Sequence, residues 1–251
     1  MLLRALVFCL ALITPVAAEE VVAGLSQDRI SITTNFDGSE ILIFGAVKRE
    51  DLIPEAPLQV IITVAGPSEP VVVRKKDRRF GIWINVEGVE VDRAPTYYAV
   101  ATSAPWTEVL TETEDLRHKI SVARAIRSVG APSDVSDPEQ FTQALIRIRE
   151  ERDLYQTNIG TVEMNEATLF NTSVRLPANL TEGEYTTRFF LTRNGRVVAS
   201  DETVIFVDKV GMERFLFDLS RQQPLIYGLM SLAIAIAAGW GASAFFRYLR
   251  G

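Results

Sequence analysis

The stretch EYTTRFFLTRNGRVVASDETVIF, residues 184–206, decides the class of fold. Two runs in which apolar and polar residues largely alternate flank the dipeptide Asn194-Gly195. Such a dipeptide between alternating runs is the strongest short-range signal for a β-hairpin, because both residues tolerate the positive φ angles of a type I′ turn. The stretch therefore predicts two antiparallel strands with one face turned toward a core.

The residues before this hairpin extend the prediction of β structure. Gly183 is followed by Tyr185 at the head of a long strand, and this pattern resembles the tyrosine corner of immunoglobulin-like sandwiches. Another run of strand type, ATLFNTSVRLP at 167–177, lies just upstream. Residues 157–210 are therefore predicted to form a β module.

The N-terminal part of the chain contains a second group of predicted strands. Strands of suitable length, without a helical period between them, are typical of a β-sandwich. Residues 19–104 and 157–210 are either two halves of one sandwich or two separate β modules, and we favour two modules. The strands predicted in the first segment are 29–36, 40–49, 58–66, 69–76, 79–87 and 96–103.

Residues 105–156 change to a helical period and predict a helical hairpin inserted between the β modules. Thr113 is the candidate N-cap of the first helix. The second is predicted to begin at Asp137-Pro138, where a capping residue precedes a proline at the first helical position. Apolar residues recur at helical spacing in both helices, namely Leu116, Ile120, Ala123 and Ile126, then Phe141, Ala144, Leu145 and Ile148.

The C-terminal end carries a candidate membrane span. The run PLIYGLMSLAIAIAAGWGASAFF, residues 224–246, has no charged residue and would reach about 34 Å as a helix, enough to cross a bilayer. Residues 211–223 predict an amphipathic juxtamembrane helix, and 247–251 form a tail. The expected fold class is thus mainly β: immunoglobulin-like β-sandwich modules with an inserted helical hairpin and one C-terminal transmembrane helix.

The first 18 residues have the parts of a secretory signal peptide: a positive charge at Arg4, a short apolar run and small residues before Glu19. We predict cleavage after Ala18, with an uncleaved anchor as the alternative. A lipoprotein signal at Cys9 is disfavoured, because Phe8 stands where a small residue is needed.

Removal of this peptide has chemical and topological consequences. Cys9 is the only cysteine, so the mature chain would have no disulfide and no thiolate chemistry. An exported N-terminus followed by one span predicts a single-pass inner-membrane protein with a periplasmic domain and a cytoplasmic C-terminus. Arg247 and Arg250 after the span agree with this orientation.

Few residues are available for catalysis or metal binding. His118 is the only histidine, and with no cysteine a zinc site is not expected. We therefore expect no catalytic residue, no cofactor and no metal, although carboxylates such as Glu112, Glu114 and Asp115 leave an envelope hydrolase as an alternative. The net charge of −6 argues against binding of nucleic acid.

Two stretches predict contacts with a partner. In GIWINVEGVEVDRAPTYYAVATS, residues 81–103, Trp83, Asn85, Tyr97 and Tyr98 form a candidate contact patch, because rigid aromatics give large contact area at low entropic cost. The other interpretation places Trp83 in the sandwich core.

The basic run RKKDRR, residues 74–79, supplies Arg78 and Arg79 as candidate contacts with a partner or with anionic lipid. It could instead be a solvated turn, or line a basic pocket of a small-anion sensor near Arg74 to Arg79. In the span, Ala237, Gly239 and Gly241 are candidate helix–helix contacts, because small residues allow close approach of another helix.

Several motifs taken together carry a family resemblance. They are GIWIN (81–85), PTYYAVATSAP (95–105), Leu-Pro-Ala-Asn (176–179), Gly-x-Tyr (183–185) and Pro-Leu-x-Tyr-Gly (224–228). In this order they resemble the Alph_Pro_TM family of transmembrane proteins of alphaproteobacteria. The resemblance implies an inner-membrane protein with a periplasmic domain and one C-terminal span, and it transfers no catalytic residue.

The resemblance also suggests a partner, a sulfite-exporter-like permease of the TauE/SafE type. We expect a non-enzymatic periplasmic binding or scaffolding protein, anchored in the bilayer and working as an accessory subunit of such an integral membrane protein. The alternatives are an envelope hydrolase that uses carboxylates and a small-anion sensor.

Overall fold

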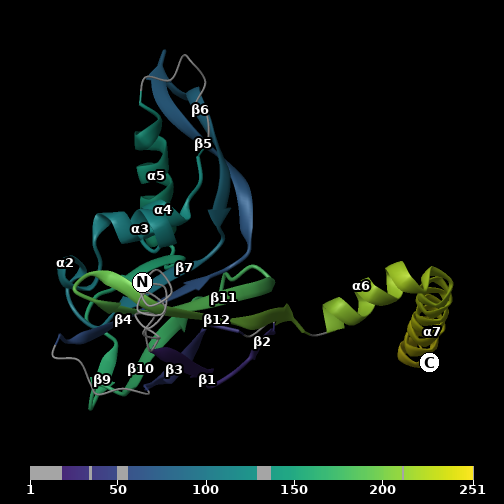
Figure 1. Cartoon of the computed structure of the whole chain (residues 1–251). Helices are drawn as coiled ribbons and strands as arrows, with labels where there is room; N and C mark the ends of the chain where they lie inside the picture. The colour runs from purple at the N-terminus through teal and green to yellow at the C-terminus, as the bar shows by residue number, and fades with distance from the viewer. Residues whose placement is uncertain (1–18, 34–35, 50–55, 129–136, 211, 251) are drawn as a thin grey trace, which may run out of the picture. The chain divides into compact units, whose positions relative to one another are not determined.

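The structure is a computed structural model that describes residues 19–33, 36–49, 56–128, 137–210 and 212–250 (Figure 1). The predicted signal peptide, residues 1–18, lies outside the described residues. The chain divides into two compact units. The first contains the residues up to Ile30 and Asp37–Val207, and the second contains Ser31–Phe36 and the residues from Asp208 onward. The fold is mainly β, with several sheets, and ends in an apolar helix.

Two larger sheets contain most of the strands. A four-stranded antiparallel sheet has the order β1-β3-β10-β9, and a six-stranded sheet has the order β2-β12-β11-β4-β7-β8. The first comprises β1 (Glu20–Leu25), β3 (Ser39–Lys48), β10 (Leu169–Leu176) and β9 (Glu163–Asn165). The second comprises β2 (Arg29–Ile32), β12 (Arg196–Lys209), β11 (Gly183–Arg193), β4 (Leu58–Ala65), β7 (Tyr98–Thr102) and β8 (Tyr155–Asn158).

The core between these sheets is held by aromatic packing. Phe170 on β10 and Phe189 on β11 are both buried, and their ring centroids lie 6.2 Å apart. Gly45 is directly opposite Phe170 in the β3–β10 pair. A Cβ atom at this glycine would lie 2.3 Å from Cζ of the Phe170 ring, so the ring covers the glycine backbone and no larger residue fits without displacing it.

The favoured division into two β modules does not describe the structure. Strand β3, from the N-terminal segment, pairs with β10, and β4 pairs with β11. Residues 19–104 and 157–210 therefore contribute to both sheets, as in the alternative of a single body. Sequence periodicity reports which face of a strand is buried, but it carries no information about which distant strand lies beside it.

The β-hairpin predicted around Asn194-Gly195 is present in the structure. Strands β11 and β12 are joined by Asn194 and Gly195, whose φ angles are +51° and +72°, as a type I′ turn requires. Before the hairpin, the Tyr185 hydroxyl donates to the Thr181 carbonyl oxygen at 2.7 Å. This is the backward hydrogen bond of a tyrosine corner.

The predicted helical hairpin is only half correct. The second helix, α5 (Pro138–Glu150), begins as expected, because the Asp137 side chain accepts hydrogen bonds from the backbone N–H groups of Glu139 and Gln140. The first is instead split into short helices. They are α2 (Trp106–Val109), α3 (Glu112–His118) and α4 (Val122–Ala125).

The break between α3 and α4 has a local cause. Lys119 adopts a left-handed conformation with φ +53° and ends α3. The Asp115 carboxylate then accepts hydrogen bonds from the backbone N–H of Ile120 at 3.1 Å and from the N–H and hydroxyl of Ser121, each at 2.7 Å. These bonds satisfy donors that a continuous helix would have bonded to its own carbonyls.

A long two-stranded hairpin rises from the sheets in Figure 1 and is formed by β5 (Ser68–Arg79) and β6 (Ile82–Pro95). Its base is buried through Val73, Val89 and Val91, which belong to a core cluster with residues of α5. The hairpin is therefore anchored by packing at one end, while the other end is exposed.

The second unit contains the two C-terminal helices, α6 (Met212–Gln222) and α7 (Pro224–Arg250). Helix α7 includes one segment, Pro224–Phe245, that is long and apolar enough to cross a membrane, with a mean hydropathy of 1.8. The predicted span and juxtamembrane helix thus coincide with observed helices, and the predicted tail continues α7 up to Arg250.

Candidate functional site

The free end of the β5–β6 hairpin presents an exposed aromatic residue. We call residues 78–84 the hairpin tip. The turn is formed by Phe80 and Gly81, with φ angles of +53° and +86°. The Phe80 side chain is fully exposed, with a relative accessibility of 104%. A bulky residue with positive φ is uncommon. The backbone of Phe80 is therefore in an unfavourable conformation, while its ring is exposed to solvent.

The rest of the hairpin tip combines apolar and cationic side chains. Ile82 and Trp83 are 64% and 67% exposed. They lie directly opposite Arg79 and Arg78 in the strand register, so each apolar residue has an arginine as its cross-strand neighbour. Exposed aromatic and arginine side chains on a rigid support are typical of protein contact sites.

The predicted aromatic patch is not assembled as expected. Trp83 and Asn85 are exposed near the end of the hairpin, so the interpretation of Trp83 as sandwich core is wrong. Tyr97 and Tyr98 are 0% and 1% exposed, so neither can join Trp83 in a surface patch. After Pro95 the chain passes from the hairpin into the six-stranded sheet, where β7 is buried on both faces.

Both tyrosines have structural roles. The Tyr97 hydroxyl donates to the Arg175 carbonyl oxygen at 2.9 Å, and the Tyr98 hydroxyl donates to the Ile120 carbonyl oxygen at 2.8 Å. Burial raises the pKa of each hydroxyl above its ordinary value because the phenolate would lose its hydration. Tyr97 is therefore a neutral residue that bonds to strand β10 of the other sheet, and Tyr98 is one that fixes the segment between α3 and α4.

The carboxylates considered for a hydrolase are also engaged in local structure. Glu114 accepts hydrogen bonds from the Arg117 guanidinium and from the Val197 backbone N–H. Asp115 holds the break after α3, and His118 lies edge-on to Phe190 with ring centroids 5.7 Å apart. In the described part of the chain, no group of three or more potential metal ligands was found.

A cavity of about 620 Å³ lies between β5 and α5. Arg74, Lys75, Lys76 and Arg147 line it together with apolar residues of both elements. This is the region in which the small-anion alternative requires a basic pocket. Arg78 and Arg79 are not part of its lining and belong to the exposed hairpin tip.

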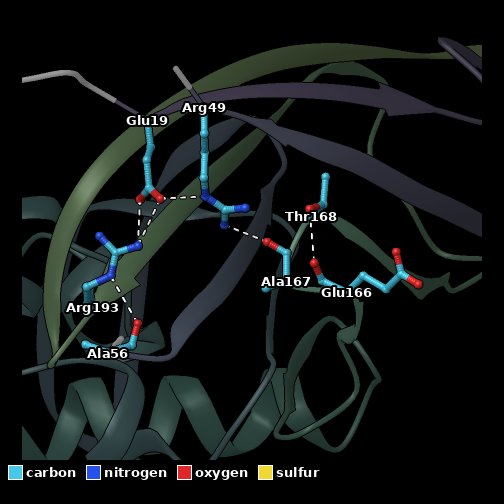
Figure 2. A network of polar contacts seen from close by, with 7 residues as sticks. All are labelled: Glu19, Arg49, Ala56, Glu166, Ala167, Thr168 and Arg193. Carbon is cyan, nitrogen blue, oxygen red and sulfur yellow. Dashed lines mark hydrogen bonds and ion pairs between the residues drawn. The ribbon is translucent and has the colours of Figure 1, made fainter. Parts of the chain in front are cut away.

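A partly buried charge network closes the N-terminal edge of the described chain (Figure 2). The Glu19 carboxylate accepts a hydrogen bond from Arg49 Nε at 2.7 Å and two from Arg193 Nη2 at 2.9 and 3.0 Å. Arg49 also donates to the Ala167 carbonyl oxygen, and Arg193 to that of Ala56. All three charged side chains are less than 20% exposed.

This network also shifts the titration of Glu19. Burial alone would raise the pKa of the carboxyl, but the hydrogen bonds and charges of Arg193 and Arg49 outweigh burial and lower the pKa. The network has no signature in the sequence, because its members are far apart in the chain and none belongs to a motif. No signal in a single sequence connects Glu19 with Arg193.

The small residues of α7 do not form one surface. On a helix, Ala237 and Gly241 share a face because they are four residues apart, whereas Gly239 is rotated to the opposite side. A Cβ atom added at Gly239 or Gly241 would meet nothing within 4 Å. Both faces therefore have room for another helix, and one partner helix can use only one of them.

The fold and the apolar helix define a class of protein, a mainly β domain followed by one candidate membrane span. Residues 20–248 match the family described as "Putative transmembrane protein (Alph_Pro_TM)". The chain belongs to this family. It matches no curated protein.

A distant similarity to one solved structure was found, the sporulation control protein Spo0M from Bacillus subtilis. The two sequences are 12% identical, and the match covers 82% of this chain and 56% of the other, with a TM-score of 0.34. The chain thus spans little more than half the length of that protein. At this TM-score, the similarity supports no conclusion about function.

Proposed function

We propose that this protein is a non-enzymatic binding and scaffolding module, held in the inner membrane by α7 and contacting an integral membrane protein through its hairpin tip. The observation that carries the proposal is the exposure of Phe80, Ile82 and Trp83 beside Arg78 and Arg79. The family resemblance suggests a sulfite-exporter-like permease as the specific partner.

The construction of the hairpin favours a contact role. Its base is fixed in the core by Val73, Val89 and Val91, so little backbone freedom remains to be lost when the tip binds. The arginines at the tip would favour an acidic surface on the partner, because complementary charge accelerates encounter and suppresses wrong partners. Aromatic and arginine side chains account for most strong contact sites in protein interfaces.

The topology in this proposal follows from the chain ends. A cleaved signal peptide would export the β domain, and α7 would then cross from the periplasm to the cytoplasm. The tyrosine corner at Tyr185 supports the further proposal that the two facing sheets are immunoglobulin-like. One of the two small-residue faces of α7 is available for a second contact with the same partner.

The alternatives receive less support from the described residues. Glu114 and Asp115 each accept hydrogen bonds that maintain α3 and the turn after it, so both carboxylates already have structural partners. The cavity at Arg74 and Lys75 suits a small-anion sensor, but it does not explain the exposed aromatic residues of the hairpin tip.

Replacement of both aromatic residues at the tip, Phe80→Ser with Trp83→Ser, is expected to reduce recovery of the membrane partner at least about 30-fold, because two central contacts are lost. The measurement is affinity capture of the tagged full chain from gently solubilised native membranes, followed by quantification of the polytopic partner. A control variant, Leu116→Ser with Ile159→Ser, removes two exposed apolar residues elsewhere and should leave recovery unchanged.

Two outcomes would contradict this proposal. One is recovery of the wild-type chain alone. The other is equal partner recovery by the tip variant and the control. If the tip variant loses binding to anionic vesicles while partner recovery is unchanged, the tip binds lipid and the proposed protein contact is wrong.

A further inference from the structure

A second cavity, of about 880 Å³, lies within the first unit and is unusually positive. It is bounded by the turn between β4 and β5, the end of β6, the region of α4 and the start of β11. Five cations and two carboxylates line it, whereas the whole chain has a net charge of −6. The charged residues are Arg93, Lys119, Arg124, Arg127, Arg188, Glu182 and Glu184. We call it the Arg93 cavity.

Two of these arginines are forced into direct opposition by the backbone. Arg93 and Arg127 form an isolated antiparallel bridge. The N–H of Arg93 donates to the carbonyl oxygen of Arg127 at 3.1 Å, and the N–H of Arg127 donates to that of Arg93 at 2.8 Å. Residues paired in this way have Cα atoms about 5.5 Å apart and side chains on the same side, and like charges directly opposite each other are destabilising.

Neither arginine of this pair forms an ion pair with another described residue, although Glu182 and Glu184 line the same cavity. Ion pairs in this part of the chain involve neither Arg93, Arg124 nor Arg127. All three side chains are exposed at the cavity. No ion pair with another described residue therefore neutralises these charges, which can attract an external anion.

Arg188 adds a fixed cation to the same cavity. Its Nη1 donates to the His118 carbonyl oxygen at 2.9 Å, and its Nη2 donates to the Lys119 carbonyl oxygen at 3.0 Å and to the Tyr98 hydroxyl at 3.3 Å. The guanidinium also lies 5.1 Å from the centre of the Phe190 ring. Neutral groups thus hold Arg188 in place and leave its charge without a carboxylate partner.

We propose that the Arg93 cavity binds a small oxyanion with at least two negative charges, of the phosphate type. Guanidinium groups bind such oxygens through paired hydrogen bonds, and the volume is in the range of small-molecule sites. The anion binds at Arg93 and Arg127 and away from Glu182 and Glu184, whose charges repel it. This site is separate from the hairpin tip and does not rest on the proposed function.

The test is thermal unfolding of the full-length protein in a non-ionic detergent, with inorganic phosphate and pyrophosphate as probes. Ionic strength is held constant with chloride. We expect a saturable rise in Tm, roughly 5–10 °C at 100 times the Kd. In the double variant Arg93→Gln with Arg127→Gln, the apparent affinity should fall about 100-fold or more.

The Tm of the same variant without a probe distinguishes loss of anion binding from loss of folding. Because the substitution removes the opposed charges, its Tm without a probe should equal or exceed that of the wild-type protein. The control Arg152→Gln removes an exposed arginine that does not line the cavity and should retain the full response.

The proposal is overturned if neither probe gives a saturable shift with the wild-type protein. It is also overturned if the double variant responds as the control does, or if the shift follows ionic strength and not the identity of the anion.

Discussion

Substitution Glu19→Gln is expected to lower the free energy of unfolding by about 2–3 kcal/mol, because it leaves the partly buried cations of Arg49 and Arg193 without a counter-charge. Both guanidinium groups depend on this one carboxylate, with N–O distances of 2.7 to 3.0 Å. The measurement is urea unfolding of the full chain in detergent micelles at pH 7, followed by tryptophan fluorescence.

The neighbouring residue provides a matched control for this experiment. Glu20 pairs with Lys48 at 2.9 Å, but both side chains are 62% exposed. Glu20→Gln should therefore change the free energy of unfolding by about 0–1 kcal/mol. If the two substitutions change the free energy of unfolding equally, the inference that the partly buried Glu19 network stabilises the fold is wrong.

The pH dependence of stability should distinguish the wild-type protein from the Glu19→Gln variant. The folded protein has a lowered Glu19 pKa, so the stabilisation from this carboxylate is fully present above its unfolded pKa of about 4.3 and is lost as the pH falls through the folded value. The urea midpoint of the wild-type protein should fall more steeply below about pH 4.3 than that of Glu19→Gln. Parallel curves would show that Glu19 does not titrate as described.

Substitution Phe170→Ala is expected to destabilise the protein by about 3–5 kcal/mol, since it opens a cavity between the two sheets. Phe170 is 1% exposed, contacts Phe189 and covers Gly45. Phe80→Ala makes the same chemical change at a fully exposed position and should alter stability by no more than about 0.5 kcal/mol. Urea unfolding as above measures both variants.

These two phenylalanine variants also separate stability from partner binding. Phe80→Ala should weaken capture of the membrane partner while the protein stays fully folded. If Phe80→Ala instead destabilises the protein as much as Phe170→Ala, the ring is a core residue and the hairpin tip is not an exposed contact surface.

The elements that the sequence predicted well are those with local signals. Asn194-Gly195 specified the β11–β12 turn because both residues accept positive φ. Asp137 specified the start of α5 through its capping hydrogen bonds. The uncharged run from 224 specified α7, because its length and composition need no knowledge of distant residues.

The features that the sequence did not reveal depend on distant contacts. Trp83 and Tyr98 both lie in alternating runs, yet one is exposed on a protruding hairpin and the other is buried in a sheet. Alternation has the same period in both settings, so it cannot separate them. The opposition of Arg93 and Arg127 likewise comes from chain topology, because the two residues meet only through an isolated bridge.

Because N-terminal strands pair with C-terminal strands, the domain can finish folding only late in synthesis of the chain. Synthesis proceeds from the N-terminus, yet Ile62 on β4 pairs with Phe189 on β11, and Ile43 on β3 pairs with Thr172 on β10. β3 and β4 can pair early with β1 and β7, but each lacks its second neighbour until most of the polypeptide has emerged, and contacts between distant residues form slowly. The unpaired edges of β3 and β4 would be open to aggregation during that interval, so a nascent chain of this protein is expected to require a holding chaperone.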